Sequence, residues 1–227
     1  MEKGYRHEYK YLISKADAEL LKLRLPHIME RDPHAGETGQ YTIRSLYFDD
    51  LASTAYFDKT DGVNYRAKYR IRFYNYDPSI LKLEKKEKLG NLTRKTAQTI
   101  TKNDARALEY ALSSGCPDTQ AGLVEELRLK FASEGLRPRV LVDYDRTPFI
   151  CRDGNTRITL DENVRTRPYI AHLFASPRAM IPVMDANQVI LEVKFDDFIP
   201  GYLLTALSDI PKINMAISKF AMCMSYI

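Results

Sequence analysis

The chain has 227 residues, of which 44% are hydrophobic and 28% are charged, and its net charge is +4. This length suits one domain with a substantial core, so we expect residues 1–227 to form a single domain, and the modest net charge excludes a globally basic nucleic-acid coat protein. The sequence has no CxxC pair, no apolar signal region and no apolar run near the ~20 residues of a membrane span, which predicts a cytoplasmic protein with reduced thiols.

The first half of the chain predicts strands separated by short helices and turns. A strand near Arg6 precedes Ser14, which is typical of a helix N-cap, and Pro26 marks the end of that helix. Turn residues at Asp77-Pro78-Ser79 and at Gly90-Asn91 separate three successive strands. The expected strands are 41–49, 63–76, 80–88 and 93–101, and the expected helices are 51–59, 103–113 and 120–133.

The second half predicts two long strands, an irregular region and a last strand before a helical C-terminal part. A turn at Asp153-Gly154 separates the first two strands, and three prolines predict that residues 163–187 are irregular. The expected strands are 137–151, 156–162 and 188–195, and the expected helices are 202–208 and 213–225.

The segment Tyr65–Phe73 places a positive charge on every second residue. A strand has a period of two, so the four cations from Arg66 to Arg72 would share one face and the apolar residues the other. Like charges side by side on a strand repel each other. The four cations therefore indicate that a polyanion lies against this face.

Four further segments combine an apolar face with a charged face. One explanation is a set of antiparallel strands with a solvated outer face. The alternative is a wide barrel whose charged faces surround a hydrated lumen, where cations would hold phosphate oxygens and carboxylates a divalent metal. The charged sets are Arg6-Glu8-Lys10, Lys82-Glu84-Lys86-Lys88, Arg157-Thr159-Asp161 and Glu192-Lys194.

Eight short segments follow one another along nearly the whole chain, at residues 6–11, 45–49, 68–74, 83–86, 144–146, 157–161, 191–194 and 218–220. Together they resemble the VTC (vacuolar transporter chaperone) domain of the triphosphate tunnel metalloenzymes, which are CYTH-like proteins. The resemblance implies an α+β fold, namely a closed antiparallel β-barrel of eight strands with helices outside and a C-terminal helix near the tunnel. It also implies binding of triphosphate or polyphosphate with Mn²⁺ or Mg²⁺ and, in the VTC branch, polyphosphate synthesis from a nucleoside triphosphate.

The resemblance also assigns side chains to the tunnel. Arg suits bidentate phosphate contacts and Lys acts as a point charge. Strand parity allows only one of Arg94 and Lys95 to face inward, and the fifteen tyrosines are interpreted mainly as packing of the barrel wall. Tyr144 could instead be core and Ser218 part of a polar helix stripe. The expected catalytic residues are Lys10, Arg70, Arg72, Lys86, Arg146, Arg157 and Lys219, and the expected substrate-binding residues are Lys68, Lys82, Arg94, Lys95, Arg139, Tyr144, Lys194 and Ser218.

The candidate metal ligands are the carboxylates of the charged faces. The resemblance places the metal-binding carboxylate of the family at Glu192. Glu8 and Glu84 are further candidates, and each sits in a Glu-x-Lys motif, so an internal salt bridge that separates cations is the alternative. Asp161 is interpreted as a strand-end turn residue or as another ligand.

Three functions follow from these observations. The first is a metal-dependent polyphosphate polymerase that uses ATP, the second is a tunnel triphosphatase, and the third is a non-catalytic polyphosphate sensor. General RNA binding would be steeply salt-dependent, and the modest net charge does not favour it. A polymerase whose product leaves the cytoplasm would need a membrane-spanning partner, which co-purification from membranes would detect.

Overall fold

The computed structural model describes residues 5–90, 92–110, 122–168, 173–176 and 180–227. Its α-helices are α1 (Lys15–Arg24), α2 (Thr54–Thr60), α3 (Lys102–Glu109), α4 (Leu123–Ser133), α5 (Gly201–Ser208) and α6 (Lys219–Met224), and its 3₁₀ helices are Leu25–His27, Pro33–Ala35 and Asp153–Asn155. Its strands are β1 (Arg6–Ser14), β2 (Glu30–Arg31), β3 (Tyr41–Asp49), β4 (Tyr65–Tyr74), β5 (Asp77–Leu89), β6 (Leu92–Ile100), β7 (Arg137–Cys151), β8 (Thr156–Pro168), β9 (Ile181–Pro182), β10 (Gln188–Phe195) and β11 (Ile213–Asn214).

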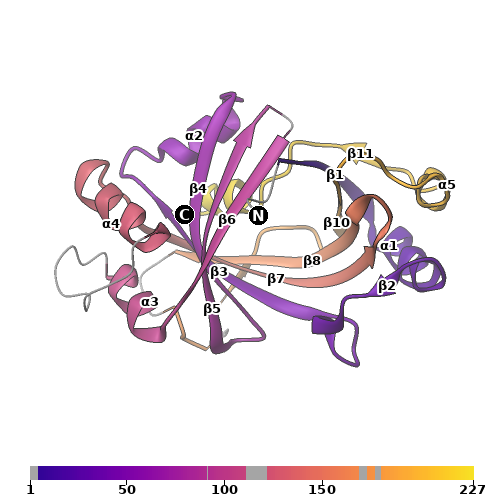
Figure 1. Cartoon of the computed structure of the whole chain (residues 1–227), viewed down its shortest axis with the longest axis horizontal. Helices are drawn as coiled ribbons and strands as arrows, with labels where there is room; N and C mark the ends of the chain where they lie inside the picture. Colours follow the sequence, from indigo (N-terminus) through magenta and orange to yellow (C-terminus); the bar gives the residue numbers. More distant parts are fainter. Residues whose placement is uncertain (1–4, 91, 111–121, 169–172, 177–179) are drawn as a thin grey trace.

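Eight antiparallel strands close into a barrel (Figure 1). Their order is β7-β3-β4-β5-β6-β1-β10-β8, and the pairing of β8 with β7 completes the ring. The short strands β2, β9 and β11 extend β7, β8 and β1. The expected α+β fold with a closed eight-stranded barrel is confirmed. No helix in the described ranges is long and apolar enough to span a membrane.

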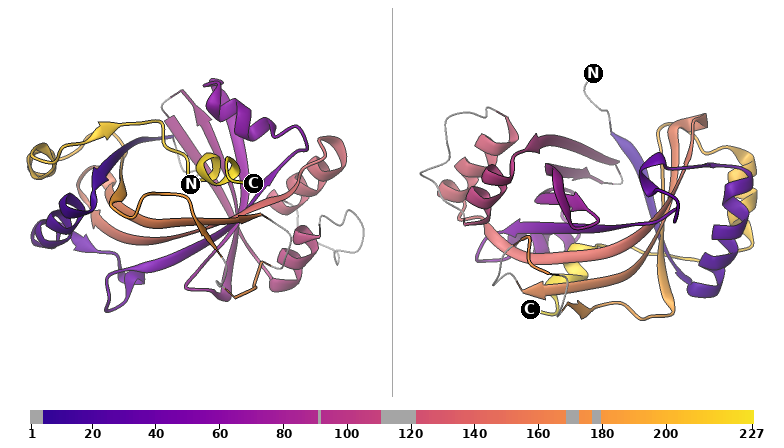
Figure 2. Two further views of the ribbon diagram at one scale, coloured as in Figure 1. Left: turned by 180° about the vertical axis from the view of Figure 1, so that it is seen from behind. Right: turned by 90° about the horizontal axis from the view of Figure 1, so that it is seen from below.

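The apolar faces of the strands point outward and are covered by helices on two sides. On one side α3 and α4 pack on β4 and β5, where Leu127 joins a cluster with Ile71 and Leu83. On the other side α1 and α5 cover β8 and β10, where Leu21 packs near Leu191. The two helical layers lie at opposite ends of the view in Figure 2. Because the apolar faces are used in this way, the charged faces of the same strands point into the barrel.

The third apolar cluster lies inside the barrel and surrounds α6. Phe220, Cys223 and Met224 of this helix pack against inward-facing side chains that include Tyr47 and Val142. The C-terminal helix is therefore near the tunnel, as expected, but its predicted start at residue 213 is wrong. Residues 213–214 pair with β1 instead, and Ser218 caps α6 by accepting a hydrogen bond from the Ala221 backbone.

Two other local predictions are corrected by the structure. Asp77–Ser79 is the start of β5, and the hairpin turn lies at Asn75 and Tyr76, whose φ values of 49° and 57° are left-handed. Such values suit a tight hairpin turn. The region 163–187 is only partly irregular, because β8 continues to Pro168 and β9 pairs with it. Residues 169–172, 177–179, 111–113 and 120–121 lie outside the described part of these predicted segments.

Candidate functional site

The interior of the barrel contains three cavities that share lining residues. The central cavity, of about 220 Å³, contains the guanidinium groups of Arg70, Arg72, Arg146 and Arg157. It shares Glu8 and Lys86 with a cavity of about 240 Å³ that we call the lysine mouth, and Tyr41, Tyr74, Lys95 and Arg157 with a cavity of about 540 Å³ that we call the tyrosine mouth. The shared lining residues show that the three cavities adjoin one another along the barrel interior, and we refer to the three together as the passage. The cations of the lysine mouth are Lys10, Lys59, Arg66, Lys68, Lys86 and Lys88.

Two of the Glu-x-Lys motifs face each other inside the passage. Glu8 lies opposite Lys194 on the neighbouring strand, and Lys10 lies opposite Glu192. The Lys10 ammonium is 3.3 Å from Glu8 and 3.9 Å from Glu192, and Lys86 is 2.7 Å from Glu8. Burial raises the pKa of both carboxyl groups, but the surrounding ammonium groups outweigh it and hold each pKa below its usual value. The two carboxylates are therefore charged and close together.

This arrangement fits a hard divalent cation. Glu8 and Glu192 both contact Lys10, and Thr159, directly across the strand pair from Glu192, buries a hydroxyl with no hydrogen-bond partner among the described residues. No cluster of three or more His, Cys, Asp or Glu that could hold a metal occurs within those residues. Mg²⁺ and Mn²⁺ are commonly bound by one or two carboxylates with phosphate and water oxygens as the remaining ligands. The donor set of Glu8, Glu192 and Thr159 suits that mode of binding.

Glu84 has a different environment from the other two glutamates. It is fully buried, its Oε2 atom accepts a hydrogen bond from Arg70 at 2.8 Å, and its Oε1 atom accepts one from Lys95 at 3.0 Å. Arg72 approaches it at 3.8 Å. Burial raises its pKa, but the two arginines and Lys95 hold that pKa well below the usual value. These contacts favour the internal salt bridge over a metal ligand for Glu84.

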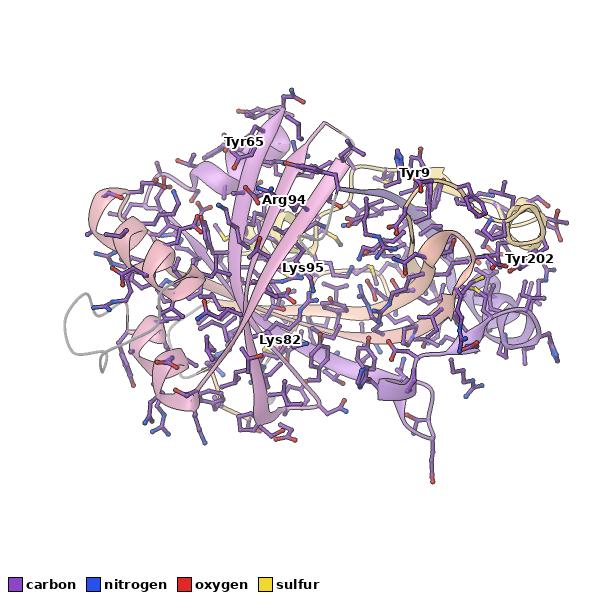
Figure 3. The ribbon with its side chains drawn as sticks, viewed as in Figure 1. Tyr9, Tyr65, Lys82, Arg94, Lys95 and Tyr202 are labelled. Carbon is purple, nitrogen blue, oxygen red and sulfur yellow. The ribbon has the colours of Figure 1, made fainter. Side chains whose placement is uncertain are left out.

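The choice between Arg94 and Lys95 follows from strand register. Lys95 pairs with Lys86 on β5 and its ammonium contacts Glu84 inside the barrel, whereas Arg94 pairs with Glu87 at 3.0 Å on the other face. Figure 3 labels both side chains on β6. Arg94 is nevertheless among the residues that line the central cavity.

A second buried cluster joins β7, β8 and α6. Arg146 donates two hydrogen bonds to Asp161, at 2.6 and 2.8 Å, and the Lys219 ammonium lies 2.5 Å from the same carboxylate. Asp161 is thus a buried residue within β8 rather than a strand-end turn residue. Lys219 lies inside the barrel because α6, which Ser218 caps, begins there. Tyr144 is more than a packing residue of the core, because its hydroxyl accepts a hydrogen bond from Arg72 at 3.0 Å.

Two lysines of the lysine mouth have lowered pKa values. Burial and the positive charges of Arg66 and Lys10 lower the pKa of Lys68 to about 6. Burial lowers the pKa of Lys86 to about 8, although the Glu8 carboxylate opposes this. Lys68 contacts the Ser218 hydroxyl at 3.5 Å and takes part in none of the ion pairs among the described residues. A polyanion that enters this mouth would stabilise the charged form of both lysines.

The remaining expected residues are not all in the passage. Lys194 lines the central cavity, Arg157 lies between that cavity and the tyrosine mouth, and Lys82 lines the tyrosine mouth. Arg139 lies elsewhere: its guanidinium contacts Ser53 at 3.3 Å in a separate pocket. Strand alternation places Arg139 on the face opposite the inward-facing Val140, Val142 and Tyr144.

Sequence reasoning missed several residues of the passage. Thr159 lies on the charged face of its strand but carries no charge itself. Lys59 lies on α2, outside any strand pattern. Tyr41 and Tyr74 were interpreted as packing residues of the barrel wall. Parity within β3 and β4 could have identified both tyrosines as inward-facing, because Tyr74 is two residues beyond Arg72 on the same face.

The family model described as the VTC domain matches residues 5–227. No curated protein matches the chain. Among solved structures, a "putative adenylate cyclase" from Bacillus halodurans is 19% identical with a TM-score of 0.52, covering 86% of this chain and 82% of its own. A chain of the Schizosaccharomyces pombe Mediator head module is 8% identical with a TM-score of 0.53, covering 93% of this chain and 100% of its own. At these identities the likeness concerns the fold alone.

Proposed function

The chain belongs to the VTC domain family, and on this basis we propose that it is a metal-dependent polyphosphate polymerase that transfers the γ-phosphate of ATP to a growing polyphosphate chain. The observation that carries the proposal is the row of adjoining cavities inside the barrel, which cations line along their length. Glu8 lines two of these cavities, and Glu192 lies near it, because both carboxylates contact Lys10. A growing chain of phosphates can extend along such a passage, whereas a closed pocket would limit the length of the chain.

The cations of the central cavity would neutralise and align the phosphates. Arg70 and Arg72 are held in place by Glu84, and Arg146 is held by Asp161, so their guanidinium groups do not need to reorganise when substrate binds. Preorganised charges of this kind are a main source of rate enhancement in phosphoryl transfer. Lys10 and Lys219 would supply further positive charge near the transferred group.

Glu8 and Glu192, with the Thr159 hydroxyl nearby, are the residues that would hold the divalent metal. When bound, Mn²⁺ or Mg²⁺ would supply positive charge that offsets the negative charge developing during transfer. The ammonium groups of Lys10 and Lys194, which contact these carboxylates, would then be released to the phosphates.

The reaction requires no general base from the protein. A terminal oxygen of the polyphosphate chain attacks the γ-phosphorus of ATP, the bond from that phosphorus to the β–γ bridging oxygen breaks, and ADP leaves with the bond electrons. The attacking oxygen is already ionised at neutral pH, because a terminal phosphate has a second pKa near ~6. The chain is thereby extended by one phosphate.

The test is to incubate the purified protein with ATP and Mn²⁺ and to separate the products on a gel stained for polyphosphate, beside an orthophosphate assay. Long chains that disappear when the metal is chelated are the expected result. Orthophosphate as the sole product would replace the polymerase with a triphosphatase. Tight polyphosphate binding with neither product would replace it with a sensor.

A further inference from the structure

The two mouths of the passage differ in charge. The lysine mouth combines six cations with one carboxylate, Glu8. The tyrosine mouth combines Lys82, Lys95 and Arg157 with Asp32 and Asp77. Two of its three cations are already paired, Arg157 with Asp32 at 2.6 Å and Lys95 with Glu84 at 3.0 Å. A long polyanion would therefore be attracted to the lysine mouth and would meet carboxylates at the other.

Beside its charged residues, the tyrosine mouth offers aromatic rings and neutral hydrogen-bonding groups that suit an aromatic, uncharged group. Tyr41 and Tyr74 lie with their ring centroids 5.4 Å apart in an edge-to-face arrangement, and both line this cavity and the central one. Ile80 is exposed beside them, and Asn75 and Ser79 supply hydrogen-bonding groups. The cavity volume of about 540 Å³ is within the ~300–1,000 Å³ that is typical of small-molecule sites.

From these differences we infer that the tyrosine mouth binds the nucleoside of a nucleoside triphosphate, with its base against Tyr74. The inference rests on the proposed function in one respect, namely that the substrate is a nucleotide. Stacking on an aromatic ring tolerates any base, so the site favours nucleotides over inorganic triphosphate without strict choice among bases.

This placement orients the substrate along the passage. The α- and β-phosphates lie among the arginines of the central cavity, where Arg157 borders the tyrosine mouth. The γ-phosphate then lies towards Glu8, which belongs to the central cavity and to the lysine mouth. The acceptor chain approaches from the lysine mouth, and the nucleoside diphosphate leaves through the tyrosine mouth.

The experiment compares ATP with inorganic triphosphate by calorimetry in Mn²⁺, using the full chain. In Tyr74→Leu we expect ATP to bind about 5- to 150-fold more weakly, which corresponds to the ~1–3 kcal/mol of one base stacked on an aromatic ring, while triphosphate affinity stays within twofold. Tyr74→Phe keeps the ring and is expected to bind both ligands as the unmodified protein does. Lys59→Met, at the other mouth, is expected to weaken long polyphosphate and leave ATP unchanged.

Equal losses for ATP and triphosphate in Tyr74→Leu, or no loss for either, would overturn the nucleoside site. The result is independent of polymerase activity. If the protein makes no polyphosphate but Tyr74→Leu weakens the binding of ATP and not of triphosphate, the nucleoside site stands and the proposed function does not. If the protein makes polyphosphate but Tyr74→Leu leaves its ATP affinity unchanged, the proposed function stands and the nucleoside site does not.

Discussion

The three Glu-x-Lys motifs of the barrel have the same sequence pattern but two different surroundings. Glu8 lies opposite Lys194 and Glu192 lies opposite Lys10 across β1 and β10, and most of the partners of these two glutamates are lysines. Glu84 lies opposite Arg70 across β4 and β5 and forms ion pairs with Arg70, Arg72 and Lys95. A lysine is a flexible point charge that can move aside for a metal, whereas the planar guanidinium of arginine holds a carboxylate in a fixed geometry. The residue on the neighbouring strand therefore distinguishes the carboxylates proposed to bind metal from the one in a structural salt bridge.

Glu192→Gln should produce the largest effect on catalysis. Removal of a metal-binding charge is expected to reduce metal-dependent turnover by about 10²–10³-fold or more, with polyphosphate binding largely kept because the cations remain. Measuring turnover with Mn²⁺ tests the expected loss of activity, and calorimetry with polyphosphate tests whether binding is kept. Full turnover in Glu192→Gln would show that Glu192 does not hold the metal.

Glu84→Gln tests the structural side of the comparison. It leaves Arg70, Arg72 and Lys95 without their buried counter-charge, and breaking such a network typically costs about 3–5 kcal/mol of unfolding free energy. Denaturant unfolding of the metal-free protein measures the loss, with Glu8→Gln as the matched control that should lose less. If Glu84→Gln were stable but unable to bind Mn²⁺, the assignments of Glu84 and Glu8 would have to be exchanged.

Arg70→Ala and Arg72→Ala should weaken both binding and turnover. Each guanidinium is buried in the central cavity, and a charge-assisted hydrogen bond is worth about 1.5–3 kcal/mol, so a 10- to 150-fold loss of triphosphate affinity is expected. Arg139→Ala, in the separate pocket beside Ser53, is the control and should bind normally. Triphosphate calorimetry distinguishes the two sets.

Lys68 should give the smallest effect, and it depends on pH. Its pKa of about 6 lies below the 10.5 of an exposed lysine, so the unfolded chain binds more protons than the folded one between these values. The stability of the empty protein should therefore rise with pH across that window, and Lys68→Met should flatten the rise while stabilising the protein at pH 7 by about 1–2 kcal/mol. Unfolding measured at several pH values checks this.

The same lysine should couple binding to protonation. A polyanion raises its pKa, so polyphosphate binding at pH 7.5 should take up a proton, and affinity should fall as pH rises above about 6. Calorimetry in buffers of different ionisation enthalpy measures the uptake. Uptake that is unchanged in Lys68→Met would assign the proton to another group, with Lys86 as the next candidate.

The regular period of two in β4, β5 and β10 allowed the charged face of each strand to be predicted, whereas the closed barrel, and so the inward direction of these faces, was predicted from the resemblance to the VTC domain. Two features depended on geometry that the pattern does not contain. The start of α6 is delayed by the pairing of residues 213–214 with β1, and Thr159 is singled out only by its cross-strand neighbour Glu192. A cross-strand neighbour cannot be read from one strand alone. The position of Arg139, in contrast, follows from alternation with Val140 and Val142.

The pairing of β1 with β10 also has a consequence for how the protein folds. It joins residues near the beginning of the chain to residues near its end, as in the match of His7 with Phe195. Contacts of such long sequence separation form late and slow the folding rate, because a large loop must close first. Glu8 and Glu192 lie on the two strands of this pair, so we expect the proposed metal site to form only when β1 and β10 have paired.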